Sequence, residues 1–325
     1  MPARVVCLSP YSKEQVEGLF AGRHSVDVVT VPDPPAPEAV LAACADADLV
    51  ISDKRHAHRL SRRVLENMSH CLLVQVPAAG YDAVDERAAA DLGIAVANAA
   101  GYNRDAVADW VIMAILNLVR RGAWGDRRMR EGGWPKPDMR GHELRALTVG
   151  IVGLGNVGSA VAHRLAAFGS RLLYTDIVEK SFPGGERMSF DDLLKQADIV
   201  CTHVPLDDST RHLIDEKALR KMKKGALLIN AARGPVVDEH ALLKALESGH
   251  LGGAGLDVFE QEPTPAANPL RRFENVFSSP HIGGYTEESE ARVMAVVRDN
   301  LIRVLDGKEP VNVVNSVKLG ARLPR

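Results

Sequence analysis

The stretch TVGIVGLGNVG at residues 148–158 decides the fold of this chain. It begins as an apolar, strand-like run, continues as a GxGxxG turn and leads into a helix-like segment. Asp176 ends the next strand-like run, at the distance of about 20 residues that dinucleotide-binding βαβ units place between the turn and an acidic residue. The stretch therefore predicts a Rossmann-type unit that binds a dinucleotide.

Each glycine of this turn has a separate physical task. Gly153 permits the tight turn from strand to helix, Gly155 lets the backbone approach a pyrophosphate, and Gly158 allows the helix to pack closely on the strand. Free N–H groups at the helix N-terminus then hold the pyrophosphate. Asp176 would accept hydrogen bonds from ribose hydroxyls and repel a 2′-phosphate, which favours NAD over NADP. A glycine-rich turn beside a solvated aspartate is the structural alternative.

Strand-like runs alternate with helix-like segments on both sides of this turn, which predicts parallel sheets with helical crossovers. The turn-rich stretch at 132–141 predicts a surface connection between two α/β units. Strands are expected at 4–8, 26–31, 49–52, 72–76, 94–97, 148–152, 172–176, 199–203, 226–230, 255–258 and 276–278, and helices at 13–21, 38–44, 61–68, 85–92, 105–121, 157–168, 238–248 and 287–305.

Composition narrows the class of protein. A chain of 325 residues has room for about two domains, and 46% hydrophobic with 25% charged residues indicates a globular chain. A net charge of -2 argues against nucleic acid and acidic membrane surfaces as partners. Four cysteines without metal-type spacing predict buried thiols and no metal site. Without a signal sequence or an apolar run near the ~20 residues of a membrane helix, we expect a cytoplasmic protein.

Three polar residues follow strand-like runs in the second half of the chain. Arg233, Glu262 and His281 each come a few residues after such a run. Because ligands of open α/β sheets bind at the carboxyl ends of the strands, we expect the three side chains to face one cleft.

These residue types suit the reduction of a ketone by hydride. A histidine can donate a proton to the developing alkoxide. An arginine fork can hold a substrate carboxylate and polarise the carbonyl without losing its own proton. An acidic partner would orient the imidazole and favour its protonated form. Each residue alone is more often structural or solvated, so the prediction depends on their joint occurrence downstream of the GxGxxG turn.

With these motifs the chain resembles the D-isomer-specific 2-hydroxyacid dehydrogenases, the family of phosphoglycerate, glycerate/hydroxypyruvate and glyoxylate reductases. The matching blocks are 149–158, 226–238, 252–263 and 280–286. The resemblance implies two doubly wound parallel-sheet domains: a flavodoxin-like substrate domain from 1–100 plus 288–325, and a Rossmann NAD domain at 101–287. It also implies NAD as cofactor, a small 2-hydroxy or 2-keto acid as substrate, and a homodimer.

The resemblance assigns roles to individual residues. It makes Arg233, Glu262 and His281 the catalytic set. Asp257 would hold the nicotinamide carboxamide, and the loop Ala78, Ala79, Gly80 would grip the substrate carboxylate through backbone N–H groups. The expected cofactor-binding residues are Gly153, Gly155, Asn156, Val157, Gly158, Asp176, Ile177, His203, Val204, Pro205, Thr210, Ala231, Asp257, His281 and Gly283, and the expected substrate-binding residues are Arg55, Ala78, Ala79, Gly80, Asn103, Arg233 and His281.

A basic loop follows the third strand-like run and reads DKRHAHR at residues 53–59. We hypothesise that Arg55, with Lys54 or His56, binds a second anionic group of the substrate, such as a phosphate, phosphonate or carboxylate. A solvated basic helix start is the alternative.

Other functions remain open at this stage. The same fold can oxidise formate or phosphite. It can also serve as an NAD-regulated binding protein of the corepressor type, which needs no turnover. A transferase that uses a nucleotide on this fold would not need His281 or Glu262.

Overall fold

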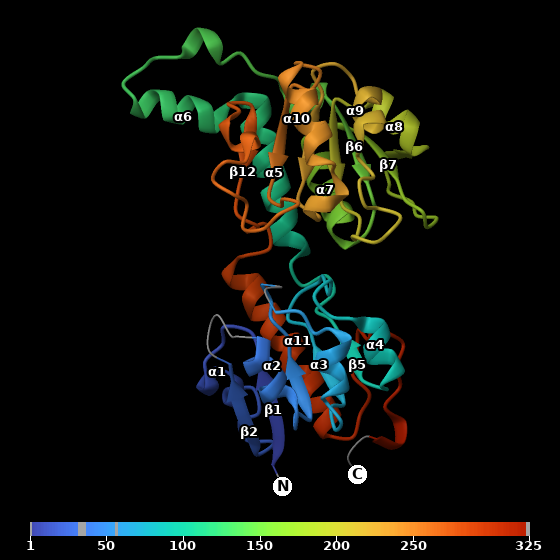
Figure 1. Cartoon of the computed structure of the whole chain (residues 1–325). Coiled ribbons are helices and arrows are strands. Elements are labelled where there is room, and N and C mark those ends of the chain that lie inside the picture. Colours follow the sequence, from blue (N-terminus) through green and yellow to red (C-terminus); the bar gives the residue numbers. More distant parts are fainter. Residues whose placement is uncertain (1, 32–36, 56–57, 323–325) are drawn as a thin grey trace. The chain divides into compact units, whose positions relative to one another are not determined.

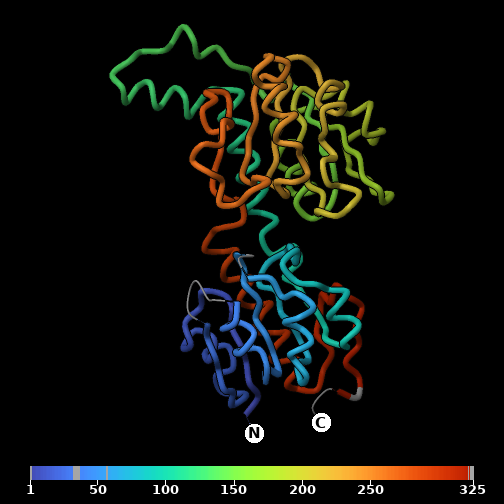
Figure 2. The backbone as a smooth tube through the Cα atoms, in the orientation of Figure 1, coloured from blue at the N-terminus to red at the C-terminus, as the bar shows by residue number. Residues whose placement is uncertain are grey.

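The computed structural model describes residues 2–31, 37–55 and 58–322, and it divides into two compact units. The first unit combines Met1–Tyr102 with Glu287–Arg325, and the second is the continuous segment Asn103–Thr286. In Figure 2 the blue and red parts of the tube accordingly run in the same unit, and the green to orange part forms the other.

The first unit is built on a parallel five-stranded sheet with strand order β2-β1-β3-β4-β5, which is the flavodoxin-like order (Figure 1). Its strands are β1 (Ala3–Cys7), β2 (Val26–Thr30), β3 (Leu49–Ile51), β4 (Leu73–Gln75) and β5 (Ala95–Ala97). Its helices are α1 (Lys13–Gly18), α2 (Pro37–Cys44), α3 (Arg62–Glu66), α4 (Glu86–Asp91) and α11 (Glu287–Leu305), with a 3-10 turn at Gly320–Arg322.

Both faces of this sheet are covered by helices. Val5 and Cys7 of β1 belong to a core shared with α1 and α11, whereas Val6 between them belongs to the core under α2, α3 and α4. This alternation is what a strand produces when both of its faces are buried. Along α11, Val293, Val297 and Leu301 recur every four residues and are fully buried, so one stripe of the helix packs on the sheet.

The second unit contains a parallel seven-stranded sheet with strand order β12-β11-β10-β9-β6-β7-β8. Its strands are β6 (Thr148–Val152), β7 (Arg171–Thr175), β8 (Gly185–Arg187), β9 (Ile199–Thr202), β10 (Leu227–Asn230), β11 (Gly253–Leu256) and β12 (Val276–Ser278). Its helices are α5 (Arg104–Arg120), α6 (Gly122–Arg130), α7 (Asn156–Ala167), α8 (Phe190–Gln196), α9 (Glu216–Lys221) and α10 (Glu239–Glu247), with 3-10 turns at Lys136–Asp138, Leu144–Ala146, Gly234–Val236 and Pro269–Arg272.

Helices cover both faces of this sheet as well. The core on one face joins the sheet to α5 and α7, and the core on the other joins it to α8, α9 and α10. The apolar stripe of α5, with Val107, Val111 and Ala114, is buried in the core of its own unit. The two doubly wound parallel sheets confirm the expected fold class.

The structure corrects two details of the sequence interpretation. The stretch 132–141 was expected to connect the two units, but it lies inside the second one, after α6. The expected strand at 255–258 begins two residues earlier and ends at Leu256, because Gly253 pairs with Leu227 of β10. Four short elements were not expected at all: α6, β8, α8 and α9.

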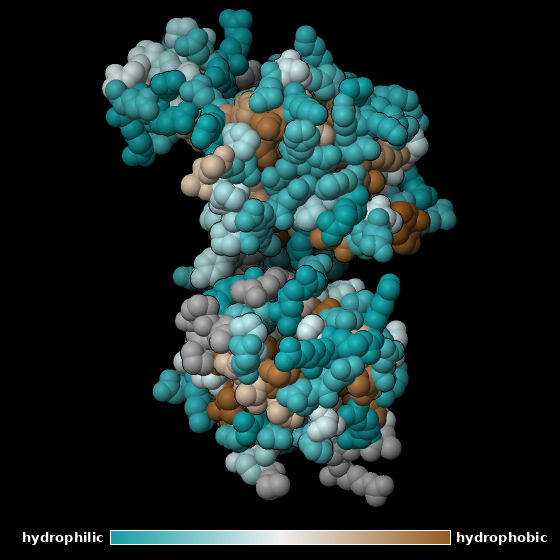
Figure 3. Space-filling view, in the orientation of Figure 1, coloured by the Kyte–Doolittle hydropathy of each residue, from teal (hydrophilic) through white to brown (hydrophobic). Residues whose placement is uncertain are grey.

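The surface carries hydrophilic side chains over most of the face shown in Figure 3, with apolar residues in small separate areas. Within the described ranges, none of the helices is both long and apolar enough to cross a bilayer. Nor does the described part of the chain bring together a cluster of metal-ligating side chains. The four cysteines, Cys7, Cys44, Cys71 and Cys201, are buried free thiols.

Candidate active site

The GxGxxG turn joins β6 to α7 with the backbone that a dinucleotide requires. Gly153 has a φ of 94°, and a Cβ there would approach the carbonyl oxygen of His203 to 2.7 Å. A Cβ on Gly158 would collide with the carbonyl of Gly153. Around Gly155, in contrast, a Cβ would meet nothing within 4 Å, so open space lies at the start of α7. This cradle fits a pyrophosphate on the helix N-terminus.

Asp176 lies directly after β7, and its side chain is only 8% exposed. One carboxylate oxygen accepts the N–H of Val178 at 2.9 Å, and the other accepts the N–H of Leu154 at 2.8 Å and the ammonium of Lys180 at 3.1 Å. Burial works to raise the pKa of Asp176, but these donors outweigh it and hold the pKa below its usual range. The Asp176 side chain is therefore an anion that is hydrogen-bonded to the backbone of the glycine turn.

A buried amide positions the loop that carries Arg233. Asn230, at the end of β10, is 1% exposed; its Nδ2 donates to the carbonyl of Arg233 at 2.9 Å, and its Oδ1 accepts the N–H of Ala232 at 3.1 Å. The same Oδ1 accepts the hydroxyl of Thr202 at the end of β9 at 2.9 Å. The half-buried Arg233 thus stands on a loop that is fixed to two neighbouring strands.

The next loop lies against this one. A Cβ on Gly234 would overlap the backbone of Phe259 and reach Glu260 N at 2.5 Å, so only glycine permits this approach. From this second loop, Glu262 reaches His281, whose Nδ1 lies 2.7 Å from the carboxylate oxygen Oε2. The loops after β10, β11 and β12 therefore bring the three expected catalytic residues to one edge of the sheet.

The charge of Glu262 is maintained by its neighbours. Its Oε1 accepts the N–H of Phe259 at 2.9 Å, which leaves Oε2 for the imidazole of His281. Burial favours a higher pKa for Glu262, but the hydrogen bond and charge of His281, the Phe259 N–H and the charge of Arg233 together lower it. The site thus contains a carboxylate, a guanidinium and an imidazole that is held through one ring nitrogen.

The structure places the other expected cofactor residues around the carboxyl edge of the same sheet. Burial of the His203 ring after β9 lowers its pKa to about 4, so this imidazole is neutral. Thr210 closes its loop by donating to the carbonyl of Pro205 at 2.7 Å. Ile177 follows Asp176 and is fully exposed. The remaining ones occupy positions after β9, β10 and β12 or in the first turn of α7: Asn156, Val157, Val204, Ala231 and Gly283.

Asn103 immediately precedes α5 in the second unit. Its amide nitrogen would lie 2.7 Å from a Cβ on Gly284, so the start of this helix closely approaches the glycines that follow His281. Asp257 follows β11, and both of its carboxylate oxygens accept N–H groups from the residues just after His281.

In the first unit, the expected carboxylate-binding loop follows β4. The carbonyl of Ala78 accepts the N–H of Ala99 at 2.9 Å, and the carbonyl of Ala79 accepts the side-chain amide of Asn98 at 2.6 Å. These two bonds fix the carbonyls of Ala78 and Ala79. Gly80, the next residue, is half-buried.

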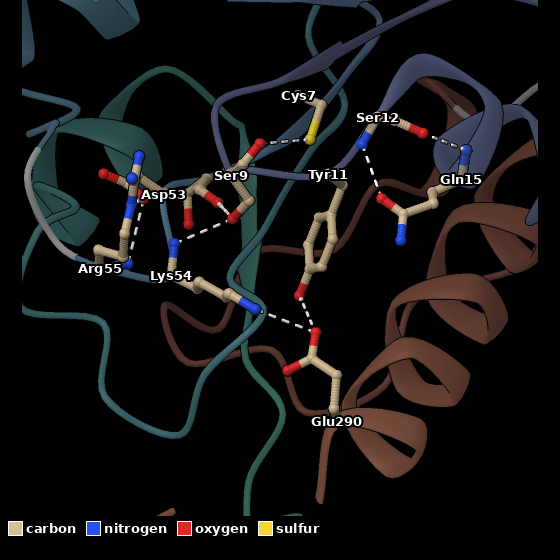
Figure 4. A network of polar contacts seen from close by, with 10 residues as sticks. Cys7, Ser9, Tyr11, Ser12, Gln15, Asp53, Lys54, Arg55 and Glu290 are labelled. Carbon is tan, nitrogen blue, oxygen red and sulfur yellow. Dashed lines mark hydrogen bonds and ion pairs between the residues drawn. The ribbon is translucent and has the colours of Figure 1, made fainter. Parts of the chain in front are cut away.

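The basic loop of the first unit is strongly paired (Figure 4). Arg55 donates from its backbone N–H and from Nε to one oxygen of Asp53, whose side chain is fully buried. The ammonium of Lys54 binds Oε1 of Glu290 on α11 at 3.0 Å, where the hydroxyl of Tyr11 also donates at 2.9 Å. Each of the two cations thus has a carboxylate partner within its own unit.

His56, the third residue of that hypothesis, lies outside the described residues.

A cavity of about 650 Å³ lies in the second unit, and Arg233, Glu262 and His281 are not among the residues that line it. Its walls include Ile199, Leu227 and Val276, which begin β9, β10 and β12. It therefore opens at the amino edge of the sheet, whereas the residues described above gather at the carboxyl edge.

Sequence reasoning did not single out Asn230, Ser279 or Trp110 as site residues. Asn230 ends an otherwise apolar strand-like run, and a polar side chain at such a position could have predicted a buried, hydrogen-bonded amide. Ser279 and Trp110 lie far apart in the sequence, and only the fold shows that their side chains are hydrogen-bonded.

Comparisons with known proteins agree with this geometry. A family model for the "D-isomer specific 2-hydroxyacid dehydrogenase, NAD binding domain" matches residues 112–283. A glyoxylate reductase of Thermofilum pendens is 42% identical over 301 residues, which cover 89% of this chain and 87% of the relative. An (S)-sulfolactate dehydrogenase of Chromohalobacter salexigens is 39% identical over 259 residues, which cover 77% of this chain and 83% of the relative. The crystal structure of a glyoxylate reductase from Paecilomyes thermophila matches with a TM-score of 0.88 at 30% identity, and the match covers 98% of this chain and 99% of that structure's chain.

Proposed function

We propose that this chain, which belongs to the D-isomer specific 2-hydroxyacid dehydrogenase family and is an NAD-dependent oxidoreductase, reduces a small 2-keto acid of the glyoxylate type. The observation that supports this most directly is the 2.7 Å contact between His281 Nδ1 and Glu262, on loops that pack beside the loop of Arg233. The substrate class also agrees with the names of the curated relatives.

In this proposal the three side chains divide the work. Bound NADH supplies a hydride to the keto carbon of the substrate. His281, held through Nδ1, donates the proton on Nε2 to the carbonyl oxygen as the C–O double bond becomes a single bond. Arg233 holds the substrate carboxylate and draws electron density from the carbonyl, and Glu262 stabilises the imidazolium before the proton leaves. The reverse reaction returns the proton to the same nitrogen.

The chain's own residues would hold the cofactor in the second unit. The open space at Gly155 would accommodate the pyrophosphate, and the Asp176 carboxylate would accept hydrogen bonds from the adenosine ribose.

The test is the loss of NADH absorbance with glyoxylate, hydroxypyruvate and longer 2-keto acids, beside formate and phosphite with NAD. We expect turnover of small keto acids and a loss of at least about 10²-fold in His281→Gln, the usual contribution of a general acid. His212→Gln is the matched control, because His212 also contacts a glutamate, Glu260, at 2.8 Å. Turnover of formate alone, or full activity in His281→Gln, would contradict the proposal.

A second candidate is a 2-keto acid that carries another anionic group. The relative that is a sulfolactate dehydrogenase favours it, since its named substrate carries a sulfonate beside the carboxylate. Arg55 follows β3, is 38% exposed, and has its Nε oriented by buried Asp53. We propose that its guanidinium binds the second group.

Substitution of Arg55 distinguishes the two candidates. Arg55→Met should lower kcat/KM on sulfopyruvate by roughly 10-fold or more, the effect of a charge-assisted hydrogen bond, and leave glyoxylate reduction nearly unchanged. Arg59→Met is the matched control, since Arg59 is exposed in the same loop and donates to the carbonyl of Asp82. Equal losses on both substrates would refute the role of Arg55.

We also propose that the protein is a homodimer. The segment from α6 to β6 projects from the rest of its unit (Figure 2), and it exposes Trp134 at 75% and Met129 at 46%. Large exposed apolar side chains on a projecting segment are typical of an interface with a second copy. Light scattering should give the mass of a dimer, and Trp134→Asp should shift it toward the monomer; a monomeric wild type would refute the proposal.

The compartment is proposed to be the cytoplasm. The four buried free thiols agree with a reducing environment. Fractionation of cells should recover the protein with cytoplasmic markers.

A further inference from the structure

A hydrogen-bonded chain crosses the second unit from α5 to the loop of His281. The indole N–H of Trp110, on α5, donates to the hydroxyl of Ser279 at 2.8 Å. The hydroxyl of Ser279, just after β12, donates in turn to Oδ1 of Asp257 at 2.6 Å. Trp110 and Asp257 are 5% and 2% exposed, so both ends of the chain are buried, and Ser279 between them is half-buried.

Asp257 binds the backbone of His281 and of the two residues that follow it. Its own carbonyl accepts the N–H of His281 at 2.7 Å. Its Oδ1 also accepts the N–H of Ile282 at 2.8 Å, and its Oδ2 accepts the N–H of Gly283 at 2.7 Å. Three successive backbone N–H groups therefore bind one aspartate residue, and the aspartate fixes the position of His281.

The loop needs this support because its backbone is strained. His281 has a φ of 55°, in the left-handed region that a residue with a Cβ adopts at a cost. A Cβ on Gly283 would lie 2.8 Å from Oδ2 of Asp257 and 3.7 Å from Cβ of Trp110, so the loop lies closely against both residues. Such a conformation persists where the surroundings over-determine it.

We propose that Trp110 is a positioning residue for His281, acting through Ser279 and Asp257. The indole can only donate, so its bond to Ser279 uses one lone pair of the hydroxyl oxygen and turns the hydroxyl proton toward Asp257. Without that donor the serine hydroxyl is free to rotate, and the carboxylate loses a fixed partner. Trp110 thereby keeps Asp257 aimed at the N–H groups that follow His281.

The inference rests on the proposed reductase function, but its test includes a measurement that needs no turnover. Trp110→Phe removes the N–H and keeps an aromatic ring beside Phe277, whose ring centroid is 6.0 Å from that of Trp110. We expect kcat to fall roughly 5- to 10-fold, the effect of about one neutral hydrogen bond, while the Kd for NADH changes less than about twofold. The amides of Ile282 and Gly283 should exchange with deuterium faster by a similar factor.

Two further variants separate positioning from simple packing. Ser279→Ala should reproduce the fall in kcat and the faster exchange, whereas Ser279→Thr, which keeps a hydroxyl, should show neither. Trp110→Phe combined with Ser279→Ala should lower kcat no further than Ser279→Ala alone. Trp124→Phe is the matched control, because this indole donates to Glu274, which precedes β12, whereas Ser279 follows that strand; the variant should leave kcat and exchange unchanged.

The outcomes are distinct. Additive losses in the double variant, or a lower Tm with unchanged kcat and unchanged exchange, would show that Trp110 only fills the core and would overturn the proposal. If the wild type reduces no keto acid, the proposed function fails, and faster exchange in Trp110→Phe would still support the positioning role. Unchanged exchange would overturn the positioning role even in an active enzyme.

Discussion

Replacing Glu262 by glutamine separates the charge of this side chain from its shape. In the wild-type protein the carboxylate accepts the N–H of Phe259 with one oxygen and contacts Nδ1 of His281 with the other, at 2.7 Å. A glutamine can keep the first bond, but its amide NH2 must then face Nδ1. That arrangement favours a neutral imidazole with its proton on Nε2, so the variant lacks the imidazolium that donates most readily.

The size of the effect follows from the contact and its exposure. A hydrogen bond to a charged group contributes about 1.5–3 kcal/mol, and exposure of 40% for the His281 side chain and 35% for Glu262 reduces this to about 1–2 kcal/mol. We therefore expect kcat/KM for keto-acid reduction to fall roughly 5- to 30-fold at neutral pH.

The assay is the loss of NADH absorbance at neutral pH, with Glu260→Gln as the control. Glu260 contacts Nε2 of His212 at 2.8 Å from the same loop, so this variant breaks a pair of the same chemistry away from His281. It should leave kcat/KM nearly unchanged. Equal losses in both variants, or full activity in Glu262→Gln, would refute the reasoning.

The same pair affects stability with a definite sign. The pKa of Glu262 is lowered in the folded protein. Its contribution to the free energy of unfolding is therefore fully present above the ordinary carboxyl pKa and is lost as the pH falls through the lowered folded value. Wild type should thus lose its advantage in Tm over Glu262→Gln as the pH falls through that interval, and an advantage that grows would contradict the assignment.

Three further substitutions test other parts of the site. Gly158→Ala should weaken NADH binding by roughly 10-fold or more, measured by fluorescence titration, because its Cβ collides with the carbonyl of Gly153 and displaces the start of α7. Lys180→Met should raise the ratio of kcat/KM for NADH over NADPH severalfold, since it removes the cation that offsets Asp176 at 3.1 Å; an unchanged ratio would exclude that role. Asn230→Ala should lower both Tm and kcat, by about 1–3 kcal/mol in stability, because it leaves the carbonyl of Arg233 and the N–H of Ala232 without this partner.

The fold was predictable because its signals are local. The GxGxxG turn, the acidic residue after the next strand and the alternation of apolar runs each occupy a short stretch of sequence. The short elements α8 and α9 were missed although Ser189 and Asp215 cap them, and these capping residues are sequence signals that could have been used. The segment 132–141 was misinterpreted because turn residues mark a surface loop without showing which elements it joins.

The site was predictable only in part, for a similar reason. Arg233, Glu262 and His281 follow strands whose carboxyl ends share an edge, so their convergence follows from topology. The partner of Lys54 does not, because Glu290 approaches Lys54 from a helix that is more than 200 residues away in the sequence. A run of basic residues predicts positive charge, but only the fold shows that Asp53 is buried beside Arg55 and that a carboxylate of α11 pairs with Lys54.

The polar residues that end neighbouring strands explain how reactive side chains on loops are held in place. Asn230 fixes the loop after its own strand by binding the carbonyl of Arg233, and Asp257 fixes the loop after the adjacent strand by binding the N–H groups from His281 onward. Both are almost completely buried, where an unpaired amide or carboxylate would cost far more than the bond itself contributes. Because the sheet dictates where these two residues lie, its rigidity is passed to loops that would otherwise be mobile. Substitution of Asn230 should therefore lower kcat more than it changes the affinity for the cofactor.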